Sequence, residues 1–268
     1  MSVIPKTFLL LFLLSMLPTI CHAGAREDGL QAFKEGNYEL SLSYWTPLAL
    51  AGDREIQYNL GVMYSEGRGV EKDIKQAIRW LTEASQQGDA DAQFRLAKIY
   101  THDADTEQDL DKALRWLQLA AKQNHATACY YLAQFYSHGK ALPKDELVAL
   151  RWYYKAAEFG NTSAMYNLGY IHEYGQGVPI NYPEAFNWYD KAARKGAADA
   201  QANLGRLLLT GKGTKTDKIQ AYAWFKLAAE QNMNNAAKNA QFTFKQLNRT
   251  EQQHAADLYA AYKKQFIK

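Results

Sequence analysis

Two histidines are the first candidates for chemistry in this sequence, because they occupy equivalent places 36 residues apart. His102 and His138 could approach each other if the segments that carry them are neighbours, and Asp103 lies beside the first of them. A zinc site needs three or four ligands, and no complete set is evident here. We therefore expect no metal and no other cofactor.

Other polar and aromatic side chains recur with the same period and change in identity from one copy to the next. They are Arg95, Lys98 and His102, then Tyr131, Gln134 and His138, then Asn167, Tyr170 and Tyr174, and finally Arg206. Tyrosine and arginine are enriched at protein interfaces because they combine a large contact area with hydrogen bonding. We expect these residues to form a surface that binds another protein. The alternative is an ordinary solvated face.

Signatures of catalysis are absent from the sequence. It contains no H-E-x-x-H, no P-loop, no G-x-S-x-G and no G-x-G-x-x-G. The formal net charge of +3 gives no reason to expect nucleic acid, which would need a basic stripe. We expect a protein that is neither an enzyme nor a nucleic-acid-binding protein.

The first 23 residues have the pattern of a secretory signal peptide. Lys6 precedes an apolar run over residues 7–17 that is too short to span a membrane, and Ala23 ends a cleavage-site pattern. We expect cleavage after Ala23, no transmembrane segment in the mature chain, and export to the periplasm or, alternatively, to the extracellular space. An uncleaved anchor and lipidation at Cys21 are the other possibilities.

Signal cleavage would remove Cys21 and leave Cys129 as the single cysteine of the mature chain. An exported protein with one cysteine has no internal disulfide, so its stability must come from packing. Cys129 lies in an apolar helical pattern, and we expect it to be a small buried residue.

A period of 36 residues organises most of the chain, as an internal repeat does. The period is carried by Trp80, Trp116, Trp152, Trp188 and Trp224, with Trp45 at 35 residues before the first. Alanine stands three residues before and four residues after each of these five tryptophans, and leucine stands twenty before. The alanines would let neighbouring helices approach closely, and the tryptophans would fill the space between them.

Each copy has the pattern of a helical hairpin. In the first copy, Ile56, Leu60, Met63 and Tyr64 form one apolar helical face. Gly67 ends this helix, and Asp73 with Gln76 forms the capping box of a second one. The same box recurs as Asn181 with Glu184 and as Asp217 with Gln220. One hairpin cannot bury its own apolar face, so the hairpins must stack into a solenoid.

The period also sets the predicted domain organisation. The boundaries are a signal peptide at 1–23, an N-terminal half-repeat at 24–53, repeats at 54–89, 90–125, 126–161, 162–197 and 198–233, and C-terminal capping helices at 234–268. The second repeat has residues 101–105 where glycines are expected, so its loop should differ. In the last segment, Thr250 with Gln253 predicts a capping box, followed by an apolar stripe that ends at Phe266.

The unit resembles the Sel1-like repeat, a relative of the tetratricopeptide repeat. The clearest copies run from Tyr58 to Ser85 and from Tyr166 to Ala193, and the resemblance covers about residues 54 to 232. It implies an all-α fold, a right-handed α-solenoid of antiparallel helical hairpins. The first helices of such hairpins line the concave surface, which would place the recurring Tyr, Arg and His residues there.

The resemblance implies a scaffold or adaptor that binds a partner protein of the cell envelope on this concave face. It transfers no catalytic residues, because the motif is structural. The alternative is a cell-wall-fragment-binding protein or hydrolase with β-lactamase-like activity, a property linked to cysteine-rich members of the family. The paired cysteines of those members are missing from this sequence.

Overall fold

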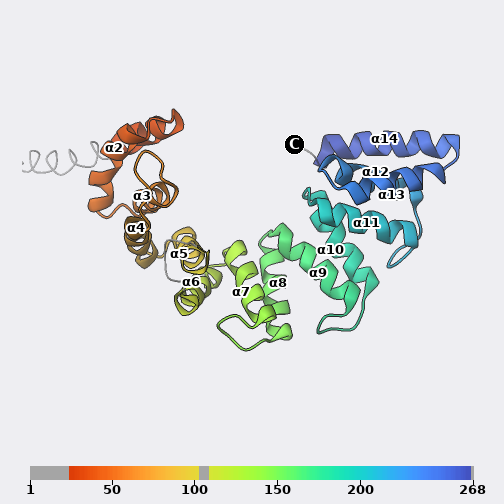
Figure 1. Cartoon of the computed structure of the whole chain (residues 1–268), viewed down its shortest axis with the longest axis horizontal. Coiled ribbons are helices and arrows are strands. Elements are labelled where there is room, and N and C mark those ends of the chain that lie inside the picture. The colour runs from red at the N-terminus through yellow and green to blue at the C-terminus, as the bar shows by residue number, and fades with distance from the viewer. Residues whose placement is uncertain (1–23, 103–108, 267–268) are drawn as a thin grey trace, which may run out of the picture. The chain divides into compact units, whose positions relative to one another are not determined.

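The computed structural model describes residues 24–102 and 109–266, in which every regular element is an α-helix (Figure 1). The helices pair into hairpins, and the predicted fold class, an all-α solenoid of helical hairpins, is confirmed. No helix within these ranges is both long and apolar enough to cross a membrane. The predicted signal peptide (1–23), the loop residues 103–105 and the His102 side chain lie outside the described part.

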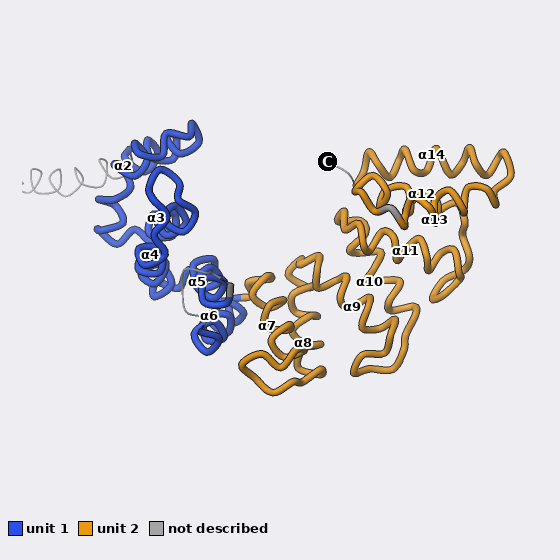
Figure 2. Tube along the Cα trace, in the orientation of Figure 1, with its two compact units in different colours: residues 1–123 blue, residues 124–268 orange. Residues whose placement is uncertain are grey.

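The chain divides into two compact units, residues 1–123 and 124–268 (Figure 2). The first unit starts with a helix over residues 24–34. Its further helices are α2 (Tyr38–Leu50), α3 (Arg54–Glu66), α4 (Ile74–Gln86), α5 (Ala90–His102) and α6 (Leu110–Lys122). Helix α3 packs on α4, and α5 packs on α6, so repeats one and two are two stacked hairpins.

The second unit contains three more hairpins and the C-terminal helices. Its helices are α7 (Ala126–His138), α8 (Glu146–Glu158), α9 (Thr162–Tyr174), α10 (Tyr182–Arg194), α11 (Ala198–Thr210), α12 (Lys218–Glu230), α13 (Asn234–Lys245) and α14 (Arg249–Phe266). The second helix of each hairpin contacts the first helix of the next one, α8 with α9 and α10 with α11. Helices α13 and α14 both pack on α12, where a sixth hairpin would otherwise stand.

Side-chain caps begin almost every helix of the hairpins. The Asp73 carboxylate accepts a hydrogen bond from the Gln76 backbone N–H at 3.0 Å, and Asn181 and Asp217 cap their helices in the same way. At the other end of α3, Gly67 adopts φ 69°, a left-handed conformation that glycine reaches without a steric penalty. The predicted starts of these second helices are therefore confirmed.

The start of α14 is different from the prediction. Asn248 accepts a hydrogen bond from the Glu251 N–H at 3.0 Å, and Glu251 accepts one from the Asn248 N–H at 2.8 Å. The capping box is thus Asn248 with Glu251, and the predicted pair of Thr250 with Gln253 is wrong. Both pairs fit the sequence rule, but the helix begins at Arg249, which leaves Asn248 as the capping residue.

The recurring tryptophans fill the core only in some repeats. Trp45 and Trp224 are each 1% exposed, because additional aromatic rings cover them. Phe33 stacks on Trp45 at 5.5 Å, and Tyr262 and Phe266 lie 4.6 and 5.5 Å from Trp224. The tryptophans of repeats two to four are half-buried. The capping helices therefore supply the rings that bury the tryptophans at the two ends of the array.

Buried glutamines connect consecutive second helices, a feature that the sequence pattern did not reveal. Gln93 is 4% exposed; its amide donates to the Ser85 carbonyl at 3.2 Å and accepts from Gln123 at 2.9 Å. The same arrangement occurs at Gln57 and Gln201. Repeats three and four have Cys129 and Met165 at this place, so these repeats pack without the polar link.

Replacing Gln93 with alanine should lower the free energy of unfolding by about 2 kcal/mol, because the buried Ser85 carbonyl loses its donor. Urea unfolding followed by circular dichroism measures this loss. The matched control is Gln86→Ala at an exposed site on α4, which should change stability by less than about 0.5 kcal/mol. Equal stabilities of the two variants would show that the link contributes nothing.

Candidate functional site

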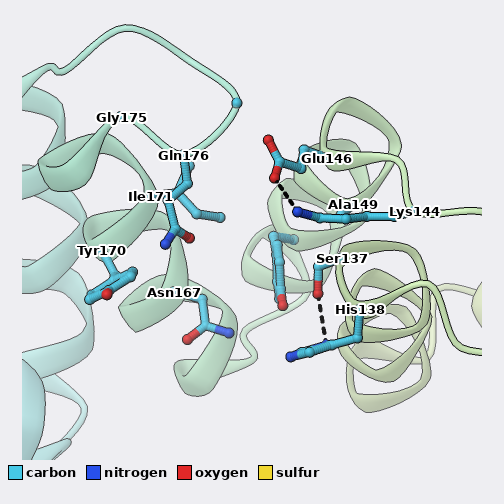
Figure 3. A pocket seen from close by; sticks show the side chains of 12 residues that line it. Ser137, His138, Lys144, Glu146, Ala149, Asn167, Tyr170, Ile171, Gly175 and Gln176 are labelled. Carbon is cyan, nitrogen blue, oxygen red and sulfur yellow. Dashed lines mark hydrogen bonds and ion pairs between the residues drawn. The ribbon is translucent and has the colours of Figure 1, made fainter.

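A hollow of about 620 Å³ lies between the third and fourth repeats, within the second unit. Figure 3 shows Asn167 and Tyr170 of α9 on one side, and Ser137, His138, Lys144 and Glu146 on the other. Tyr153 of α8 and Ile171 of α9 also line it. We call this site the repeat 3–4 hollow. Its lining combines aromatic, amide, imidazole and charged groups, which suits a polar chain such as a peptide.

Several of the polar groups in the repeat 3–4 hollow are held by neighbours. The His138 Nδ1 lies 2.9 Å from the Gln134 carbonyl and 3.0 Å from the Ser137 hydroxyl. Lys144 and Glu146 form an ion pair at 2.7 Å. The opposite charges therefore cancel locally, and the hollow has no strong preference for an anion or a cation.

Two exposed tyrosines extend from the hollow along α9. Tyr170 is 38% exposed and Tyr174 is 54% exposed, and their ring centroids are 4.5 Å apart. Rigid aromatic side chains of this kind supply large contact area at low entropic cost.

Within each compact unit, tyrosine hydroxyls link the first helices of consecutive repeats, α3 with α5, α7 with α9, and α9 with α11. The Arg95 Nε donates to the Tyr58 hydroxyl at 3.3 Å, and Asn167 is hydrogen-bonded to Tyr130. Tyr166 is bonded in the same way to Asn203 of the following repeat. Arg95 and Asn167, two of the predicted binding residues, therefore connect neighbouring repeats.

A buried carboxylate on α9 connects repeats four and five. Glu173 is 4% exposed; it accepts from the Tyr189 hydroxyl at 3.1 Å and pairs with Arg206 at 2.7 Å. Burial, with the adjacent carboxylate, raises the pKa of Tyr189 far above its usual range. Gly169 leaves room for the Tyr189 ring, because a Cβ at this position would lie 2.6 Å from the ring's Cδ1. Arg206 is thus anchored across the boundary between two repeats.

A second buried polar pair lies between repeats three and four. The Tyr154 hydroxyl is 2.6 Å from the Nε2 of His172, which is 8% exposed. The other ring nitrogen, Nδ1, is buried without a hydrogen-bond partner. Burial lowers the pKa of His172, although the nearby Glu184 carboxylate acts in the opposite direction.

The structure places the predicted binding residues in two groups. Arg95 and Lys98 are in the first unit; Tyr131, Gln134, His138, Asn167, Tyr170, Tyr174 and Arg206 are in the second. Lys98 is exposed, and Arg95 is half-buried and pairs with Glu66 at 3.0 Å. The repeat 3–4 hollow brings His138, Asn167 and Tyr170 together.

The sequence pattern did not lead to four residues near these sites, which are Lys144, Glu146, His172 and Glu173. The sequence does mark His172 and Glu173, because each differs from the residues at the equivalent position of the other repeats. His172 replaces Tyr64, Tyr100 and Tyr136, and Glu173 replaces Ser65, Thr101 and Ser137. A polar or charged residue at a place that is neutral in the other copies indicates a local interaction worth locating.

Metal-binding groups do not gather in the part of the chain that the structure describes, where no three His, Cys, Asp or Glu residues are placed to hold an ion. Whether His102 approaches His138 is not tested, because the His102 side chain is outside that part. Cys129 is buried as predicted, and burial raises the pKa of its thiol. Such a thiol is a poor nucleophile at neutral pH.

Comparison with known proteins gives a family and a fold. The Sel1 repeat model matches residues 55–89, 90–125, 126–161, 162–196 and 198–233. A crystal structure of a Sel1 repeat protein from Oxalobacter formigenes is similar, with TM-score 0.75 and 29% identity over 88% of this chain and 98% of that one. A comparison with curated proteins finds no match.

A second similar structure is a protective antigen of uropathogenic Escherichia coli strains that displays an SLR fold. It has TM-score 0.55 and 28% identity, and the alignment covers 91% of this chain and 61% of the antigen. This chain therefore spans less than two thirds of that protein. The five matched repeats, the stacked hairpins and the similarity to solved relatives agree, and the chain belongs to the Sel1 repeat family.

Proposed function

We propose that this protein is an exported scaffold that binds a partner protein through the first helices of its second unit, with the repeat 3–4 hollow as the central contact. Sel1 repeats generally mediate protein–protein interaction. The observation that carries the proposal is the pair of exposed rings, Tyr170 and Tyr174, beside a hollow lined by polar groups. Tyrosine is enriched among interface hot spots, which lie in pockets that become desolvated on binding.

The proposed partner contributes an extended segment that lies across the hollow. Its backbone would meet the amide side chains of Asn167 and Gln176, and an apolar or aromatic side chain would pack on Tyr170. The locally cancelled charge of Lys144 and Glu146 favours a segment that is neutral or of mixed charge.

Export rests on the N-terminal pattern, and we propose the periplasm, with the extracellular space as the alternative. The Sel1 repeat family is generally non-enzymatic, and no comparison supports the hydrolase alternative. Hydrolysis of nitrocefin by the purified chain would reopen that alternative.

The double variant Tyr170→Ala with Tyr174→Ala should lose the partner, because truncation of hot-spot aromatics costs about 2 kcal/mol or more, a factor of about 30 in affinity. The test is cross-linked affinity capture from the envelope fraction with mature residues 24–268. The matched control is Phe242→Ala, which removes an equally large ring that is 60% exposed on α13.

A partner identified with wild type and with the Phe242 variant, but lost by the tyrosine double variant, would support the proposal. The thermal unfolding of all three proteins is compared first, so that a loss of capture reflects the surface alone. Equal capture by all three would place the interface elsewhere.

A further inference from the structure

The repeat 3–4 hollow and the buried Tyr154–His172 pair lie at the same contact between helices α8 and α9. Tyr153 and Ile171 line the hollow, and the next residues along each helix, Tyr154 and His172, form the 2.6 Å hydrogen bond. Successive residues of a helix point about 100° apart. Any change in the packing of α8 against α9 at this bond therefore reaches the walls of the hollow.

If the His172 ring takes up a second proton, one of its N–H groups has no hydrogen-bond acceptor. In the neutral ring, Tyr154 satisfies Nε2 and the unpartnered Nδ1 is already buried. Protonation would leave both nitrogens as donors and would add a charge to a side chain that is only 8% exposed. The charged ring is therefore favoured when it reaches water, which requires α8 and α9 to separate locally.

The charged groups around the ring do not compensate for this cost. From α8, the facing group is the neutral Tyr154; from α10, it is Glu184, whose carboxylate already accepts from the Trp188 Nε1 at 2.8 Å. On α9 itself, Glu173 is occupied by Tyr189 and by Arg206 of α11. Because burial outweighs the Glu184 charge, the pKa of His172 is lowered.

We propose that His172 makes the repeat 3–4 hollow pH-sensitive: proton uptake opens the α8–α9 contact and weakens binding of the partner segment. The regulation of binding rests on the proposed function, whereas the opening itself does not. The histidine occurs only at the boundary between repeats three and four, since the other repeats have Tyr64, Tyr100, Tyr136 and Leu208 at the equivalent position.

The direction in which stability changes with pH follows from the linkage between proton binding and folding. A histidine whose pKa is lower in the folded state contributes stability that is present above its unfolded pKa, near 6.5, and that is lost as the pH falls. Between pH 7.5 and pH 5.5, the equilibrium constant for local opening should rise up to about tenfold, the limit set by one proton over one pH unit below 6.5.

Hydrogen exchange of the amides in α8 and α9 measures this opening without any partner. After correction for the intrinsic pH dependence of exchange, wild type should lose up to about tenfold in protection at pH 5.5 relative to pH 7.5. His172→Leu should show the same protection at both pH values, since Leu208 fills this place in repeat five. His254→Gln, at an exposed histidine on α14, should behave like wild type.

A second readout follows the ring directly. The NMR titration of His172 should give a pKa below 6.5, in contrast to a ring that titrates in solvent. If His172→Leu does not fold, this titration together with wild-type exchange still decides the matter. An unchanged opening constant between the two pH values, or a titration at or above 6.5, would overturn the inference. Failure to find a partner would remove the proposed function and the regulation of binding, but not the pH-dependent opening.

Discussion

Replacing Trp224 with alanine should destabilise the second unit by about 3–5 kcal/mol, the usual cost of emptying a large buried aromatic site. Trp224 is 1% exposed, and the rings of Tyr262 and Phe266 lie 4.6 and 5.5 Å from it. These contacts attach α14 to α12, so the substitution removes the surface on which the C-terminal helix docks. Because stability in a repeat array depends on neighbouring interfaces, the end would unfold first.

The matched comparison is Trp188→Ala, at the same place in the preceding repeat. Trp188 is half-buried, its Nε1 donates to Glu184 at 2.8 Å, and Lys191 lies 3.9 Å from its ring. Its removal should cost about 1–2 kcal/mol, since solvent already reaches one face. Urea unfolding measures both losses, and hydrogen exchange in α14 should increase only for the Trp224 variant. Similar losses at the two sites would mean that the capping helix does not rely on Trp224.

This contrast also shows how far the sequence predicts the fold. The 36-residue spacing and the caps at Asp73 and Asp217 predicted the hairpins, because helix periodicity and capping are local properties. The burial of each tryptophan was not predictable from the period. It depends on which helix packs over the ring, and Phe33 and Phe266 come from segments outside the repeat.

The site was predicted less completely than the fold. Tyr170 and Tyr174 are on the surface, as the helical pattern required. The hollow itself arises from the loops that carry Lys144 and Gln176, and the length and path of loops are not set by helix periodicity. Whether this surface binds a partner stays a prediction.

Replacing Arg206 with methionine should cost about 3 kcal/mol or more, because it leaves Glu173 buried with no cation. Glu173 is 4% exposed, and its remaining contact would be the Tyr189 hydroxyl. Arg206 is itself about one third exposed, which keeps the expected cost at the lower end of the range for buried ion pairs. Urea unfolding of the single variant gives the value.

Converting the whole network to apolar residues should restore most of that loss. The triple variant Glu173→Leu, Tyr189→Phe, Arg206→Met uses Leu209 and Phe225 of repeat five as its templates, and removing all members of a buried ionic network is often neutral. A triple variant as unstable as the single one would show that the network itself, rather than an orphaned carboxylate, holds repeats four and five together. If the triple variant is stable, it also separates two roles of Arg206. Retained partner capture would then mean that the arginine serves the stack alone, whereas loss of capture by a stable protein would place the Arg206 guanidinium in the interface.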